Sequence, residues 1–172
     1  MSSPNEKINE FFGKIDELPE KDRIQFRRGC GLMLRDAGAE LLMLFYHVLP
    51  HDIEWGEDRW FTAACIHCLW KAEEKNRLPM EKAIARLKSN DEISDSFEHR
   101  LIALMDTAWS EDGYLNDKLV RMAKMLKQKD YAVDGGALLE SLLKWNSEYR
   151  SVQKQWAKAY CNTDKLIENT EE

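Results

Sequence analysis

The chain has 172 residues, of which 44% are hydrophobic, enough to bury a core in one domain or in two small helical lobes. Because it has no run of about eighteen apolar residues and its N-terminal segment is polar, the sequence predicts neither a membrane span nor a secretory signal, and we expect a cytoplasmic protein. The formal net charge of −6 argues against a protein that coats DNA by bulk attraction, since phosphate would repel it.

The elements predicted along the chain are all helices. Proline occurs only at positions 4, 19, 50 and 79, and the stretches between are rich in Leu, Met, Ala, Glu, Lys and Arg, which lose little side-chain freedom in a helix. Strand-like alternation of apolar and polar residues is absent. The sequence therefore predicts an all-α, two-lobed bundle of about eight or nine helices, at residues 5–17, 20–35, 37–48, 57–74, 79–88, 94–107, 111–127, 135–146 and 148–161.

The segment around residues 90–96 is the predicted boundary between the two lobes. We expect an N-terminal helical lobe at residues 1–90 and a C-terminal helical bundle at residues 91–162. Residues 163–172 form an acidic tail, which we expect to be disordered.

The predicted helix at 111–127 combines an apolar stripe with a basic face. The stripe recurs at spacings of four, three and four, which places it on one side of a helix; its members are Leu115, Leu119, Met122 and Leu126. No acidic residue lies between Lys118 and Lys129, so we expect the outer face to be purely positive. The basic residues of this face are Lys118, Arg121, Lys124 and Lys127.

The last predicted helix carries a second basic ridge. Its expected inward stripe consists of Trp145, Tyr149, Val152, Trp156 and Tyr160, and the opposite ridge consists of Arg150, Lys154 and Lys158. Residues 118–158 contain nine basic and four acidic side chains, although the whole chain is acidic. The chain is therefore electrically polarised.

Metal binding is only weakly indicated. Cys65 and Cys68 flank His67 and offer soft ligands, but a structural zinc site normally has a second ligand pair at short spacing, and Cys30 and Cys161 stand alone. We interpret the four cysteines as buried thiols and predict no metal and no cofactor. Because neither a Gly-x-Ser-x-Gly turn nor a phosphate-binding glycine loop occurs, we predict that the protein is not an enzyme.

The aromatic and arginine residues give two further expectations. Five of the six tryptophans lie among apolar neighbours and are expected to anchor the core: Trp60, Trp70, Trp109, Trp145 and Trp156. Trp55 alone is expected to be exposed. Arg27 and Arg28 form a guanidinium pair that is suited to phosphate.

Seven short segments follow one another along the chain in a recognisable order. They are residues 24–29, 45–50, 82–87, 99–105, 119–127, 138–145 and 156–160, with the sequences IQFRRG, FYHVLP, KAIARL, HRLIALM, LVRMAKMLK, LLESLLKW and WAKAY. In order and spacing they resemble the CasB family, the small subunit of the type I-E CRISPR Cascade complex, over about residues 23–160.

The resemblance implies a non-catalytic helical protein that pairs with a second copy of itself and assembles with other Cascade subunits. It implies that the protein supports the guide RNA complex and stabilises opened target DNA through backbone contacts. The family's basic positions correspond here to Arg27, Arg28, Lys82, Arg100 and Arg121. The basic helix faces add Lys118, Lys124, Lys154 and Lys158 to the expected nucleic-acid-binding residues.

Two other interpretations remain open. The basic faces can be ordinary solvated helix surface on a helical adaptor that binds proteins and has no nucleic-acid role. Salt separates this interpretation from the first, because phosphate contacts weaken steeply as salt rises. A metal-dependent hydrolase that uses Cys65, Cys68 and a histidine is the third interpretation, and it predicts bound zinc in the purified protein.

Overall fold

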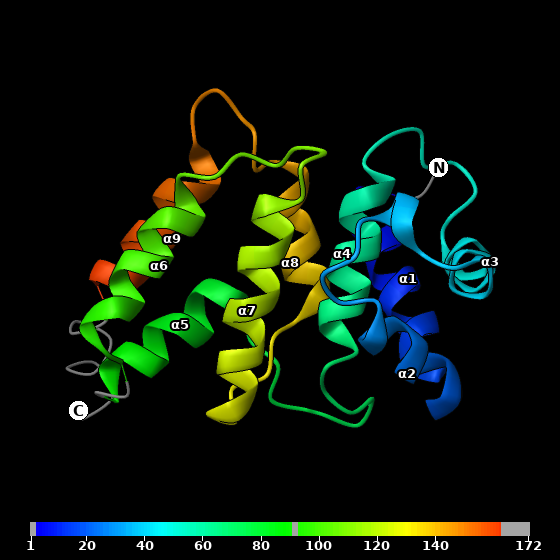
Figure 1. Cartoon of the computed structure of the whole chain (residues 1–172), viewed down its shortest axis with the longest axis horizontal. Coiled ribbons are helices and arrows are strands. Elements are labelled where there is room, and N and C mark those ends of the chain that lie inside the picture. The colour runs from blue at the N-terminus through cyan, green and yellow to red at the C-terminus, as the bar shows by residue number, and fades with distance from the viewer. Residues whose placement is uncertain (1–2, 91–92, 163–172) are drawn as a thin grey trace.

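The computed structural model describes residues 3–90 and 93–162, and within these ranges the protein consists of nine α-helices and one short 3-10 helix (Figure 1). The helices are α1 (Pro4–Glu17), α2 (Glu20–Arg28), η1 (Leu34–Asp36), α3 (Ala39–Val48), α4 (Glu57–His67), α5 (Met80–Ser89), α6 (Asp95–Met105), α7 (Tyr114–Gln128), α8 (Gly135–Leu143) and α9 (Ser151–Cys161). The described ranges contain no strand, only an isolated bridge between Leu78 and Val133. The all-α prediction is confirmed.

Local side chains explain where two of the helices begin. Ser3 accepts a hydrogen bond from the backbone N–H of Glu6, and the Glu6 carboxylate accepts one from the N–H of Ser3, so α1 opens with a capping box. The Asp134 carboxylate accepts a hydrogen bond from the N–H of Gly136 at 3.0 Å and caps α8. Both caps satisfy N–H groups that have no partner inside the helix.

Two predicted helices end about two turns earlier than expected. The helix predicted at 20–35 ends at Arg28, and the one predicted at 57–74 ends at His67. Arg77 supports the loop that replaces the last two turns of the second, because its guanidinium donates to the carbonyls of His67 (3.1 Å), Lys71 (3.0 Å) and Val133 (3.0 Å). The bonds to His67 and Lys71 satisfy carbonyls that a longer helix would have satisfied internally.

The last helix begins three residues later than predicted. Arg150 has a left-handed backbone conformation (φ 52°) immediately before α9, and its guanidinium donates to the Met105 carbonyl. Tyr149 therefore lies outside the helix and is 77% exposed, so its assignment to the inward stripe was wrong. The rest of that stripe is buried as predicted.

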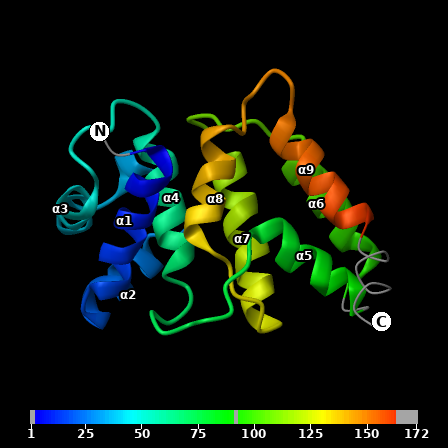
Figure 2. The same ribbon diagram turned by 180° about the vertical axis from the view of Figure 1, so that it is seen from behind.

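The buried side chains form two hydrophobic clusters. One unites α1, α2, α3 and most of α4 around aromatic rings, with Phe11 packed edge-on against Phe45 and Trp60. The other unites α5, α6, α7, α8 and α9, with Trp145 edge-on against Trp156. In Figures 1 and 2, α4, α7 and α8 lie between the two ends of the molecule. Both clusters draw on residues of α4 and α8.

The division into lobes at residues 1–90 and 91–162 stays a prediction. Four buried residues of α5, which precede the expected boundary, belong to the second cluster: Met80, Ala83, Ile84 and Leu87. Leu139 of α8 belongs to the first. The predicted acidic tail at 163–172 lies outside the described residues.

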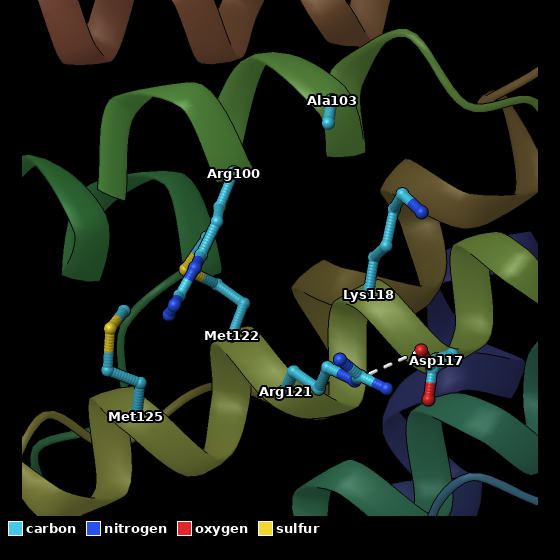
Figure 3. Close-up of a pocket in the computed structure, with 7 residues that line it drawn as sticks. All are labelled: Arg100, Ala103, Asp117, Lys118, Arg121, Met122 and Met125. Carbon is cyan, nitrogen blue, oxygen red and sulfur yellow. Dashed lines mark ion pairs between the residues drawn. The ribbon is translucent and has the colours of Figure 1, made fainter. Parts of the chain in front are cut away.

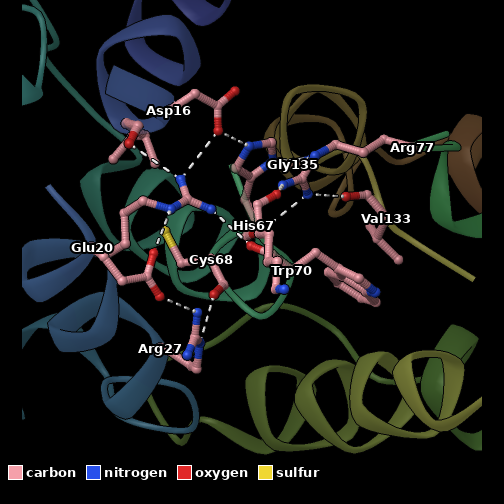
Figure 4. A network of polar contacts seen from close by, with 12 residues as sticks. Asp16, Glu20, Arg27, His67, Cys68, Trp70, Arg77, Val133 and Gly135 are labelled. Carbon is pink, nitrogen blue, oxygen red and sulfur yellow. Dashed lines mark hydrogen bonds and ion pairs between the residues drawn. The ribbon is translucent and has the colours of Figure 1, made fainter. Parts of the chain in front are cut away.

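A buried polar network joins α1, α2, α4 and α8 (Figure 4). The Arg23 side chain is 1% exposed and donates to the carbonyls of Ile15 (3.2 Å) and Trp70 (2.8 Å) and to the Asp16 carboxylate (3.2 Å). The Gly135 N–H donates to His67 Nδ1 at 3.1 Å, so His67 Nε2 carries the proton and donates to Asp16 at 2.9 Å.

The network holds His67 neutral and Asp16 ionised. Burial lowers the pKa of His67 below its ordinary value, and the hydrogen bond to Asp16 opposes this only in part. Burial by itself would raise the pKa of Asp16, but the hydrogen bond from His67 and the charges of Arg77 and Arg23 bring it below its ordinary value. From the sequence, His67 was considered only as a zinc ligand. In the structure its side chain bridges Asp16 of α1 and Gly135 of α8 and so holds the two helices together.

Candidate nucleic-acid interface

Three of the predicted basic residues line one groove between α6 and α7 (Figure 3). Arg100 comes from α6, and Lys118 and Arg121 come from α7. The groove encloses about 480 Å³, and its lining is Arg100, Ala103, Asp117, Lys118, Arg121, Met122 and Met125. We refer to this surface as the α6–α7 groove.

The helical period explains why α7 offers cations on one side and core on the other. The predicted apolar stripe is buried throughout: Leu115, Leu119, Met122 and Leu126 are each at most 4% exposed. Lys118, Arg121 and Met125 are spaced three and four residues apart, so they share a neighbouring face that borders α6. The groove therefore has cationic walls over an apolar floor of methionine and alanine.

Asp117 changes the charge of this face from the predicted one. Its carboxylate forms an ion pair with Arg121 at 3.0 Å, one helical turn away, and both side chains are more than half exposed. The expectation of a purely positive face was wrong, because the acidic residue lies one position before the segment that was free of acidic residues. The pair leaves Arg121 at the solvent, where an exposed ion pair contributes only about 0.3–0.5 kcal/mol.

Arg27 and Arg28, adjacent in the sequence, have different surroundings. The Arg27 guanidinium donates to the Cys68 carbonyl at 2.9 Å and to Glu20 at 3.2 Å, so it ties α2 to the end of α4 (Figure 4). Arg28 is exposed and borders a second cleft of about 390 Å³ beside Gln25. The two residues do not form one phosphate-binding fork.

The remaining predicted contacts are exposed but lie outside the α6–α7 groove. Lys82 is on α5, Lys124 is on α7, and Lys154 and Lys158 are on α9. None of these four lines the groove. In Figure 1, α9 lies behind α6, and in Figure 2 it lies in front, so the α9 lysines belong to the opposite layer of helices. Their role in nucleic-acid binding stays a prediction.

The tryptophans are distributed as the sequence predicted. Five are buried, at most 7% exposed, whereas Trp55 is 61% exposed. The Arg59 guanidinium lies 5.6 Å from the ring centroid of Trp55 and 5.3 Å from that of Trp109, so the exposed ring is anchored to a buried one through a cation.

The cysteines are free thiols with two kinds of environment. Cys65 and Cys68 are buried and Cys30 is partly buried, whereas Cys161 is exposed, so the expectation of four buried thiols was wrong for Cys161. Burial raises the pKa of Cys30 and of Cys68 to about 12 and raises that of Cys65 well above its ordinary value. Within the described parts of the chain, no three His, Cys, Asp or Glu residues are arranged to hold a metal ion.

The family is decided by a comparison with known protein families. The model of the CRISPR-associated protein Cse2 matches residues 22–160. The chain belongs to the Cse2 family. This confirms the resemblance to CasB that the sequence segments indicated.

Solved structures with the Cse2 fold cover nearly the whole chain. CasB from M. ruber is 25% identical, with all of each chain covered and a TM-score of 0.72. A Cse2-family protein from Thermus thermophilus is 20% identical over 94% of this chain and 99% of that chain, with a TM-score of 0.75. A chain of a CRISPR RNA-guided surveillance complex is 19% identical over 98% of this chain and 99% of that chain, with a TM-score of 0.78. The curated proteins offer no match to this Cse2-family chain.

Among the described residues of this Cse2-family chain, no helix has both the length and the apolar character needed to cross a bilayer.

Proposed function

We propose that this Cse2-family chain is a non-catalytic subunit of a type I-E CRISPR Cascade complex, where it supports the guide RNA assembly and stabilises opened target DNA through backbone contacts. Family membership and the shared fold with a chain of a CRISPR RNA-guided surveillance complex support the assembly. Its partners are then the other Cascade subunits, the guide RNA, the target DNA and a second copy of itself, in the cytoplasm.

The observation that carries the DNA-binding part is that Arg100, Lys118 and Arg121 line one groove. Guanidinium groups bind phosphate oxygens through paired hydrogen bonds, and such contacts hold a strand without reading its sequence. A guide-directed complex delegates sequence recognition to base pairing, and exchange of the DNA duplex for the guide heteroduplex is nearly balanced in energy. A few phosphate contacts are then enough to shift the balance.

The chemistry of the reactive side chains supports a binding role. The Cys30, Cys65 and Cys68 thiols have raised pKa values and stay protonated at neutral pH, so they are poor nucleophiles. The buried His67 is engaged on both ring nitrogens. The three thiols and the His67 imidazole are therefore not available to a substrate at the α6–α7 groove.

Charge reversal in the groove tests the proposal. We expect Arg100→Glu with Arg121→Glu, in the assembled complex, to weaken binding of a target duplex with an unpaired central segment by at least tenfold and to flatten its salt dependence. Lys71→Glu with Lys75→Glu reverses two exposed charges in the loop after α4, outside the groove, and is the matched control. Circular dichroism and recovery of the full complex verify folding and assembly.

The opposite result points to the alternative function. If the double variant assembles normally and binds the target with wild-type affinity and salt dependence, the groove does not hold the DNA. The helical adaptor that binds only proteins would then be the better account.

A further inference from the structure

An exposed aromatic ring extends the line of the α7 cations. Tyr114 is the first residue of α7 and is 64% exposed. Tyr114, Lys118, Arg121 and Met125 recur at spacings of four, three and four, so at 100° per residue they lie within about 60° of one another around the helix. The line spans about 16 Å along α7, with the ring at one end, two cations in the middle and a thioether at the other.

The backbone around Tyr114 is held by its own turn. Gly113 has a left-handed conformation (φ 77°) and abuts Met33, whose Cγ would lie 3.4 Å from a Cβ at position 113. The Tyr114 N–H donates to the Asp112 carboxylate at 2.9 Å, and the Asp112 N–H donates to Ser110 Oγ at 3.3 Å. The helix start is therefore fixed, and the exposed ring projects from a defined position.

The Tyr114 ring is a weak partner of Lys118, and a phosphate can replace the ring. The Lys118 ammonium lies 6.0 Å from the Tyr114 ring centroid, at the outer limit of a cation–π contact. Little interaction energy is therefore lost when the Lys118 ammonium turns away from the ring and binds a phosphate. Proteins that bind single strands combine a cationic groove, which follows the backbone, with aromatic rings on which bases stack.

We infer that Tyr114 is a stacking platform for an unpaired base, next to the α6–α7 groove, which gives this surface a preference for single-stranded over duplex nucleic acid. The inference rests on the proposed function, because the cations of the groove must hold the adjacent phosphates. In a duplex the bases are already stacked on one another, so the ring has no base face to contact. Either an unpaired DNA strand or an unpaired stretch of guide RNA has the required chemistry.

The proposal is tested with the full chain at low salt, using fluorescent oligothymidylate, oligouridylate and a DNA duplex of equal length. Tyr114→Ala is expected to weaken binding of the single strands roughly fivefold to a hundredfold, the range that stacking of one base implies. Binding of the duplex and the salt slope are expected not to change. Tyr114→Phe keeps the ring and is expected to restore wild-type affinity.

Arg121→Glu separates a failure of the stacking inference from a failure of the proposed function. If Arg121→Glu weakens binding and Tyr114→Ala does not, or if Tyr114→Ala weakens duplex binding equally, the stacking inference is overturned and the groove stands. If the wild-type chain binds no oligonucleotide at low salt, the stacking inference is overturned. If the assembled complex with Arg100→Glu and Arg121→Glu also binds its target as the wild type does, the proposed function is overturned as well.

Photo-crosslinking identifies the source of the base. Iodouracil is placed in the unpaired target strand or in the guide RNA of the assembled complex, and crosslinked peptides are mapped by mass spectrometry. A crosslink to Tyr114 from the DNA assigns the platform to the opened target, and one from the RNA assigns it to the guide; each supports stacking. Crosslinks to other residues only would overturn it.

Discussion

Replacing Gly135 by alanine tests how closely α8 is held against α1 and α4. A Cβ at this position would lie 2.5 Å from Phe12 Cε1, 2.6 Å from His67 Cβ and 2.8 Å from His67 Nδ1. These distances are shorter than van der Waals contact, so α8 must move, and the hydrogen bond from the Gly135 N–H to His67 weakens. Overpacking of this kind costs about 1–3 kcal/mol and the loss of a buried hydrogen-bond partner a further 1–3 kcal/mol.

Gly136→Ala is the matched control, because it makes the same change one residue along the same helix. A Cβ there would lie 3.4 Å from Asp134 Oδ1 and from Ile8 Cγ2, which is ordinary contact. Alanine is also favoured over glycine in a helix by about 0.5–1 kcal/mol. In urea unfolding followed by circular dichroism, we expect Gly135→Ala to lower the free energy of unfolding by about 2–6 kcal/mol relative to Gly136→Ala. Equal unfolding midpoints would refute the reasoning.

Three further changes probe the groove and the buried network. Asp117→Asn removes the carboxylate that competes with phosphate for Arg121, so it is expected to strengthen single-stranded DNA binding roughly twofold to fivefold in filter binding. Weaker binding would contradict this competition. The pKa of His67 is lower in the folded than in the unfolded protein, so the free energy of unfolding is expected to fall as pH drops below about 6.5. This pH dependence should flatten in His67→Asn. An unchanged slope in that variant would assign the pH dependence to another group. Arg27→Ala is expected to cost about 1–3 kcal/mol in urea unfolding and Arg28→Ala less than about 0.5 kcal/mol, and equal costs would contradict a structural role for Arg27.

The helical period was the most informative feature of the sequence for the fold. It predicted all nine α-helices of the described ranges and the four buried residues of the α7 stripe, because a helix buried on one side has apolar residues at spacings of three and four. No such spacing marks the ends of α2 and α4. The loop after α4 depends on Arg77 reaching the carbonyl of Val133, 56 residues away, and no local pattern reports that contact.

The candidate site could be predicted in part. Arg100 and Arg121 were expected as separate contacts, and only the packing of α6 against α7 places them in one groove. Arg27 and Arg28 looked equivalent as neighbours, but a rotation of about 100° per residue directs the first toward α4 and leaves the second in solvent. Asp117 was readable from the sequence, since its spacing of four from Arg121 is the spacing of a helical ion pair.

The net charge of −6 and a nucleic-acid groove are compatible if the groove works inside an assembly. For single strands the logarithm of the binding constant falls with that of the salt concentration by about 0.7 per phosphate contacted, so the three cations of the groove give a slope of about −2. Such a slope means modest affinity for the isolated chain. A complex that already holds the guide needs little additional binding energy from this subunit. Each 1.4 kcal/mol from added backbone contacts shifts the equilibrium constant of a nearly balanced strand exchange about tenfold. A slope for the isolated chain steeper than about −5 would show that many cations outside the groove take part, and the lysines of α9 would be the first to test.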